Sequence, residues 1–282
     1  MRVKDVLKRG LHYMIHGVPE IIVKAEVNYL NPNNKLKNKK ILLTGGSRGI
    51  GYAMAQKFIK EGAEIVITGR NEQTLKASAE KLSCKYIVLD VTKTGDFENA
   101  IETADKMLGG LNCLVNNAGV SLHEQTFFDV TPSTFDQQIN TNLRSDVFLC
   151  QCFIKHLLKH GTKGGSILCV SSEVGELADN RPYGWTKSAI NSVVRGLASN
   201  FAKDGIRINA ISPGITCSRM TGVNEDNLYI PTNATERAYL PDEVAEIASF
   251  LISDAAGCLS GQILVCNNAK TIYTRLKVEK NG

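Results

Sequence analysis

The chain of 282 residues contains 33 Lys and Arg against 28 Asp and Glu, a net charge of +5, and 43% of its residues are hydrophobic. This length fits one α/β unit, and no internal repeat or low-complexity tract divides the chain. No apolar stretch approaches the roughly 20 residues that a membrane-spanning helix needs, so we expect a soluble protein.

The basic excess lies in the first forty residues, which carry nine Lys and Arg against three Asp and Glu, while the remainder has a net charge of −1. Charged and polar residues interrupt this segment, which excludes the apolar core of a signal peptide. One interpretation is a surface helix over residues 2–16 that lies on a membrane or on nucleic acid. The other is an arm that packs on its own domain or on a partner subunit. We favour the arm because Ile21, Ile22, Val23 and Val27 look like residues that need covering.

The first predicted strand, Ile41-Leu42-Leu43, leads into Thr44-Gly45-Gly46-Ser47-Arg48-Gly49-Ile50-Gly51, and residues 50–61 have helical spacing. The glycines therefore lie on a strand-to-helix turn. Such a turn binds a pyrophosphate, because the backbone can approach the phosphate closely and the helix N-terminus offers free amides.

Three further apolar runs, at residues 64–68, 86–89 and 111–115, predict strands that alternate with helices. Such alternation predicts a parallel sheet with helices on both faces. The three runs are followed, in chain order, by Gly69-Arg70-Asn71, Asp90-Val91 and Asn116-Asn117-Ala118-Gly119.

Two later segments carry side chains suited to acid–base chemistry. The run 167–170 ends in Ser171 and Ser172, and Tyr183-Gly184-Trp185-Thr186-Lys187 follows. Because Tyr183 and Lys187 are four residues apart, they lie on one face of a helix and can address the same ligand.

Taken together, these motifs resemble those of the short-chain dehydrogenase/reductase family. The family's marks are Thr-Gly-x-x-x-Gly-x-Gly, Asn-Asn-Ala-Gly, a serine after the fifth strand and Tyr-x-x-x-Lys, and all four occur in order. The resemblance covers about Lys39 to Ala269 and is closest to 3-oxoacyl-[acyl-carrier-protein] reductases. It implies a single Rossmann-type domain over residues 39–269, with a doubly wound, parallel, seven-stranded sheet. Residues 1–38 are then a basic N-terminal extension and residues 270–282 a C-terminal tail.

The resemblance implies a catalytic tetrad. Tyr183 donates a proton to a carbonyl oxygen during reduction, and Lys187, whose ammonium favours the phenolate, also binds the nicotinamide ribose. Ser172 hydrogen-bonds the substrate oxygen. We choose it over Ser171 by the pattern of the strand end, although the loop to Tyr183 is shorter than usual. Asn142 matches the asparagine that holds a water of the proton relay, with Asn140 as the alternative.

The resemblance also implies a nicotinamide cofactor, with NADP(H) preferred over NAD(H). An acidic residue at the end of the second strand favours NAD, and Gly69 occupies that position. Arg70 and Arg48 can flank a 2′-phosphate instead. Asp90 would accept from the adenine amino group. The expected cofactor-binding residues are Gly45, Ser47, Arg48, Gly49, Ile50, Gly51, Arg70, Asp90, Val91, Asn117, Ala118, Gly119, Tyr183, Lys187, Pro213, Gly214 and Ile215.

The eight cysteines do not indicate a disulfide framework, because several fall in or beside predicted core strands. We expect reduced thiols and a cytoplasmic location. The pairs Cys150/Cys152 and His156/His160 lack a convincing set of partners, so no metal site is expected.

These observations predict an NADP(H)-dependent oxidoreductase that interconverts a carbonyl and a secondary alcohol. The alternative is a catalytically silent NADP-binding regulator or scaffold. The substrate would be a small molecule, polar or acyl-linked, because the expected lid over residues 219–240 and the loop before Tyr183 are rich in polar residues. A homodimer or homotetramer is expected, without nucleic acid and with membrane contact through the arm not favoured. Cys266-Asn267-Asn268 departs from the Asp-Gly-Gly turn with which many relatives finish the last strand.

Overall fold

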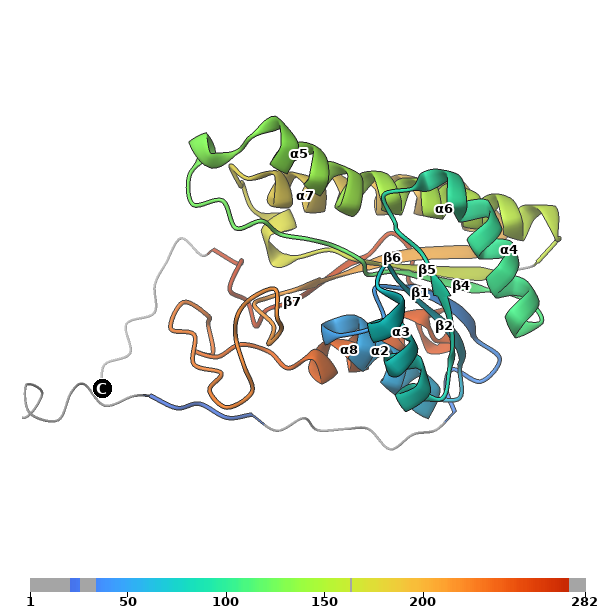
Figure 1. Cartoon of the computed structure of the whole chain (residues 1–282), viewed down its shortest axis with the longest axis horizontal. Helices are drawn as coiled ribbons and strands as arrows, with labels where there is room; N and C mark the ends of the chain where they lie inside the picture. Colours follow the sequence, from blue (N-terminus) through green and yellow to red (C-terminus); the bar gives the residue numbers. More distant parts are fainter. Residues whose placement is uncertain (1–20, 26–33, 163, 274–282) are drawn as a thin grey trace, which may run out of the picture.

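A computed structural model describes residues 21–25, 34–162 and 164–273 (Figure 1). Seven parallel strands form one sheet in the order β3-β2-β1-β4-β5-β6-β7. This confirms the predicted doubly wound sheet. The strands are β1 (Lys40–Thr44), β2 (Glu64–Gly69), β3 (Lys85–Val88), β4 (Cys113–Asn116), β5 (Gly165–Val170), β6 (Ile206–Pro213) and β7 (Ile263–Cys266).

Helices cover both faces of the sheet, with α4, α6 and α7 on one side and α2, α3 and α8 on the other (Figure 1). The α-helices are α2 (Gly49–Lys60), α3 (Glu72–Leu82), α4 (Phe97–Leu108), α5 (Pro132–Gln138), α6 (Ser145–Lys159), α7 (Pro182–Phe201) and α8 (Pro241–Ile252). The shorter turns are η1 (Thr94–Asp96), η2 (Phe127–Asp129), η3 (Ile139–Arg144), η4 (Glu173–Glu176), η5 (Ala202–Asp204) and η6 (Asp254–Ala256).

The sheet is buried on both faces, which explains why its strands are continuous apolar runs. Along β1, Ile41 and Leu43 pack with α2, α3 and α8, whereas Leu42 packs with α4, α6 and α7. Successive side chains of a strand point to opposite faces, so one short strand supplies both layers of core. The predicted runs at 64–68, 86–89 and 111–115 correspond to β2, β3 and β4 within two residues at either end.

The helical stretch from α5 to α6 is not one regular helix. Between α5 and α6 the turn η3 is a π-helix, with Asn142 buried within it. Insertions of this kind widen the helix locally and often occur at functional positions.

The N-terminal extension contributes to the fold at two places. Leu36 is fully buried in the core layer of α2, and its backbone N–H donates to the Glu61 carbonyl at 3.0 Å. Farther upstream, the Val23 carbonyl accepts a bond from the Leu228 N–H at 2.9 Å, so residues 21–25 pack on the chain's own domain. The side chains of Ile21 and Ile22 are more than half exposed, so the expectation that both are covered fails within this chain. Val27 and the helix proposed for residues 2–16 lie outside the described residues.

Within the described ranges, no helix combines the length and apolar character needed to cross a membrane.

Candidate active site

The turn after β1 has the geometry of a phosphate cradle. Gly45 and Gly49 have φ values of +69° and +54°, in the left-handed region that favours glycine. A Cβ on Gly51 would lie 2.3 Å from the Gly45 carbonyl oxygen, so no side chain fits there. At the start of α2, Arg48 is an extended N-cap whose side chain makes no capping bond, which leaves the first amides of the helix for an anion. A dinucleotide pyrophosphate fits this turn.

Hydrogen bonds hold this turn against the end of β4. The Thr44 hydroxyl accepts from the backbone N–H groups of Asn117 and Ala118 at 2.9 and 3.0 Å. In return, the Asn117 side-chain amide donates to the carbonyls of Thr44 and Gly45 at 2.9 and 3.1 Å. The two predicted motifs therefore form one unit at the carboxyl edge of the sheet.

The adenosine side of the site lies at the ends of β2 and β3. A Cβ on Gly69 would lie 3.9 Å from the Ser47 hydroxyl, so the glycine turn borders the end of β2. Arg48 and Arg70 are both exposed. A backbone N–H bond from Thr92 lowers the pKa of Asp90, burial opposes this, and Lys93 and Arg70 add to the lowering. Val91 is buried in the core layer of α4, which leaves little of it for contact with an adenine ring.

Tyr183 and Lys187 lie together on the first turns of α7. The Lys187 ammonium is 5.6 Å from the centroid of the Tyr183 ring and donates to the Val170 carbonyl, at the end of β5, over 2.7 Å. Lys187 is buried, whereas Tyr183 is half-buried. The cation is thus fixed in place beside a phenol that a ligand can reach.

Asn142 hydrogen-bonds both to the segment after β4 and to α7. Its amide donates to the Val120 carbonyl and its oxygen accepts from the Val120 N–H, both at 2.8 Å. The same amide lies 3.3 Å from the Thr186 hydroxyl of α7. A Cβ on Gly119 would lie 3.4 Å from the Asn142 oxygen and 3.8 Å from the Lys187 ammonium, so these groups surround one point. The Asn142 side chain is occupied by these bonds, and its place in a water relay stays a prediction.

The two candidate serines differ in their surroundings. Ser171 is buried, and its hydroxyl donates to the Lys187 carbonyl at 3.3 Å. Ser172 is half-buried with extended backbone at the start of η4, and its hydroxyl makes no capping bond there. Of the two hydroxyls, that of Ser172 is the better placed to bind a substrate oxygen.

Comparisons with known proteins match both the motifs and the fold. A family model described as enoyl-(acyl carrier protein) reductase matches residues 45–268. The chain is 31% identical to the 3-oxoacyl-[acyl-carrier-protein] reductase FabG of Chlamydia pneumoniae over 246 residues, covering 84% of this chain and 98% of that protein. It is 33% identical to a 3alpha-hydroxysteroid dehydrogenase of Mediterraneibacter gnavus over 249 residues, covering 83% and 97%.

The chain belongs to the short-chain dehydrogenase/reductase family. Among solved structures, it is similar to the 3-ketoacyl-(acyl-carrier-protein) reductase of Brucella melitensis complexed with NADH, with TM-score 0.79 and 30% identity over 84% of this chain and all of that one. It is also similar to a short-chain dehydrogenase of Burkholderia cenocepacia in complex with NADP, with TM-score 0.76 and 27% identity over 84% and 99%. This member of the family is an oxidoreductase acting on carbonyl or alcohol groups with a nicotinamide cofactor.

The turn Pro213-Gly214-Ile215 leads from β6 into the expected lid of this dehydrogenase/reductase. A Cβ on Gly214 would lie 2.7 Å from the ring of Tyr239 and 3.2 Å from a carboxylate oxygen of Glu173. Ile215 packs against the small apolar cluster formed by Cys217, Leu228 and Ala238. The lid is therefore an ordered loop with its own core.

The polar side chains expected to face a substrate are mostly paired within the chain. Arg181 donates two bonds to the Asp179 carboxylate, at 3.0 and 2.9 Å. Glu176 accepts from Asn191 at 2.6 Å, and Glu173 accepts from Lys270 at 2.7 Å. Because these side chains already have partners within the chain, they are weaker evidence for a polar substrate than the sequence suggested.

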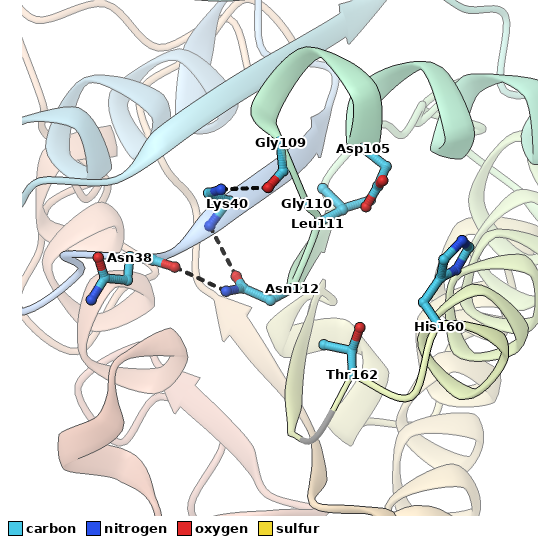
Figure 2. Close-up of a pocket in the computed structure, with 9 residues that line it drawn as sticks. All are labelled: Asn38, Lys40, Asp105, Gly109, Gly110, Leu111, Asn112, His160 and Thr162. Atoms are coloured by element: carbon cyan, nitrogen blue, oxygen red, sulfur yellow. Dashed lines mark hydrogen bonds between the residues drawn. The ribbon is translucent and has the colours of Figure 1, made fainter.

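Two cavities lie at opposite ends of the sheet. One of about 510 Å³ is lined by the loop that joins Ser172 to Tyr183: Val174, Leu177, Ala178, Asp179, Asn180 and Arg181. The other, of about 610 Å³, lies at the amino ends of β1 and β4 (Figure 2). There the Asn112 side chain accepts from the Lys40 N–H and donates to the Asn38 carbonyl, both at 2.9 Å. The 510 Å³ cavity is the one at the end of the sheet that carries Ser172 and Tyr183.

The described part of the chain contains no group of three His, Cys, Asp or Glu side chains suited to a metal ion. His156 Nε2 lies within hydrogen-bond distance, 3.0 Å, of a carboxylate oxygen of Asp105. All eight cysteines are free thiols.

One titratable group near the site escaped the sequence analysis. Asp146 lies one helical turn after Asn142 and is buried. Burial raises the pKa of its carboxyl to about 7, although Lys187 and a bond from the Ser145 hydroxyl oppose the rise. No motif marks this residue, and only its place in the apolar repeat of α6 predicts burial.

We predict that Asp146 destabilises the protein as pH rises. Its folded pKa of about 7 exceeds the ordinary 3.8, so folding takes up a proton between these values. The free energy of unfolding is therefore highest below about pH 4 and is reduced as pH rises through 7. The difference between the two pKa values of Asp146 corresponds to a loss of roughly 4 kcal/mol. In denaturant titrations, Asp146→Asn should match wild type near pH 4 and exceed it in stability at pH 8. The exposed control Asp136→Asn should follow wild type throughout, and parallel profiles of Asp146→Asn and wild type would contradict the prediction.

Proposed function

We propose that the chain is an NADP(H)-dependent carbonyl reductase, or the reverse alcohol dehydrogenase, with Tyr183 as general acid and base. The observation that carries the proposal is the Lys187 ammonium fixed 5.6 Å from the Tyr183 ring centroid. The nearby open hydroxyl of Ser172 supports it. Oligomerisation, cytoplasmic location and the domain boundaries at residues 38 and 269 stay predictions.

The proposed chemistry divides between cofactor and protein. A bound nicotinamide supplies the hydride in reduction and accepts it in oxidation. Tyr183 holds the proton at its hydroxyl and delivers it to the substrate oxygen, while the ammonium of Lys187 stabilises the phenolate that remains. The Ser172 hydroxyl donates to the same oxygen and orients the carbonyl.

Asn142 supports this arrangement by position. Through Val120 and Thr186 it connects the segment after β4 to α7, and so holds Gly119 and Lys187 at a constant separation. When Tyr183 gives its proton to the substrate oxygen, the phenolate that remains would then lie beside an ammonium held in a fixed place, which favours acid–base catalysis.

NADP preference rests on charge at the end of β2. Gly69, the last residue of β2, places no carboxylate where a ribose 2′-hydroxyl would bind. Arg70 directly follows it, Arg48 lies in the glycine turn, and both arginines are exposed. Guanidinium groups bind phosphate through paired, charge-assisted bonds. The similar structures hold NADH in one case and NADP in the other, so the preference is a property of this chain's own residues.

The proposed function predicts that Tyr183→Phe removes turnover and keeps cofactor binding. NADPH oxidation would be followed with 3-oxoacyl thioesters, keto sugars, cyclic ketones and quinones, and NADPH affinity by nicotinamide fluorescence. Loss of the acid should lower kcat by about a hundredfold or more. Tyr86→Phe, on β3, is the matched control and should keep wild-type rates. Turnover that survives in Tyr183→Phe would refute the assigned acid, and NADPH binding without turnover on any substrate would favour the silent regulator.

The cofactor proposal predicts that Arg70→Ala narrows the preference for NADPH. Loss of a charge-assisted contact to the 2′-phosphate should lower kcat/KM for NADPH about tenfold and leave the value for NADH within about twofold. Arg195→Ala, an exposed arginine on α7, controls for the change of net charge. Equal losses of kcat/KM with NADPH and NADH would show that Arg70 does not bind the 2′-phosphate.

A further inference from the structure

Two side chains after the last strand hydrogen-bond to Glu173, the residue that follows Ser172. Beyond β7, the Lys270 ammonium donates to one carboxylate oxygen of Glu173 at 2.7 Å, and the Asn267 amide donates to the other at 3.1 Å. The same amide lies 3.0 Å from the Thr271 hydroxyl. The unusual Asn267-Asn268 turn thus supplies an oriented donor where a glycine would supply none.

Glu173 is the residue directly after Ser172, and it is buried. Its carboxylate also lies against the Gly214 turn, where a Cβ would be 3.2 Å from Oε2 and 3.1 Å from the Asn267 Cβ. A carboxylate that belongs to the serine loop is therefore bonded to the segment after β7 and lies close to the turn proposed to lie beside the nicotinamide.

A buried carboxylate that has one cationic partner is held tightly, because separating the pair leaves an uncompensated charge. Consecutive Cα atoms are about 3.8 Å apart, so anchoring Glu173 restricts the positions that the backbone of Ser172 can take. The Ser172 side chain makes no capping bond of its own that would do this.

We infer that the Glu173–Lys270 ion pair, oriented by Asn267, positions Ser172 for the substrate oxygen and makes the segment after β7 part of the active site. This inference rests on the proposed function. Glu173, Asn267 and Lys270 are positioning residues: they act on the reaction through Ser172.

The test is a double-mutant cycle of Lys270→Met with Ser172→Ala, measured as kcat, KM and NADPH affinity. Lys270→Met should lower kcat about tenfold and leave NADPH affinity within about threefold. In the Ser172→Ala background it should lower kcat by less than about twofold, because the positioned hydroxyl is already absent. Lys270→Arg restores the cation and should recover most of kcat.

Lys39→Met is the matched control. Lys39 also makes an ion pair of 2.7 Å, with Asp254, and its side chain is about as exposed as that of Lys270. It lies at the amino edge of the sheet, away from Ser172. The substitution should leave kcat unchanged. Multiplicative losses in Lys270→Met/Ser172→Ala, or equal losses of kcat and NADPH affinity in Lys270→Met, would overturn the inference while Tyr183→Phe still tests the proposed function.

Hydrogen exchange tests, without any substrate turnover, whether the Glu173–Lys270 ion pair anchors the loop after Ser172. In wild type, the Gly175 N–H donates to the Ser172 carbonyl at 2.9 Å. Amides of residues 172–176 should exchange about tenfold faster in Lys270→Met than in wild type or Lys39→Met, because the loop loses its anchor. Unchanged exchange in this loop would overturn the inference even if no substrate is turned over.

Discussion

The active site depends on the hydrogen bonds between Thr44 and Asn117. Thr44 ends β1 and Asn117 follows β4, and these strands are neighbours in the sheet. Each residue satisfies backbone groups of the other's turn, so the glycine turn cannot move independently of the segment that leads to Gly119. A site for a long dinucleotide needs this constraint, since its phosphate and nicotinamide subsites lie on different turns.

The parallel direction of the strands determines where the other proposed site residues lie. All seven strands run the same way, so the segments that carry Gly51, Asn117, Ser172 and Gly214 emerge at one edge, whereas the cavity at Lys40 lies at the other. Ligands of open α/β sheets bind at such carboxyl ends. The Lys187 bond to the Val170 carbonyl then ties α7 to the same edge. The residues proposed to bind the cofactor and those proposed to act as acid and base are thus brought to one edge by the sheet itself.

The sequence predicted those parts of the protein that local chemistry determines. Apolar runs located β2, β3 and β4 within two residues, and the glycine pattern located a turn in which Gly45 and Gly49 adopt positive φ. Long-range pairing was not predictable. The Glu173–Lys270 bond joins residues 97 apart, and the π-helical turn at Asn142 depends on Val120, which only the fold brings near. Likewise, Leu36 was assigned to the extension because the family resemblance begins at about Lys39, although Leu36 is fully buried in the core.

The most direct test of this account is the NADPH dissociation constant of Thr44→Val beside that of Thr68→Val. Both threonines are fully buried and lie opposite each other in the β1–β2 register, yet among the described residues the Thr68 hydroxyl has no hydrogen-bond partner. Thr44→Val leaves the Asn117 and Ala118 amides without their acceptor and should weaken NADPH binding about tenfold or more, while Thr68→Val should bind like wild type. Equal affinity in the two variants would contradict the claim that the Thr44–Asn117 bonds hold the site together.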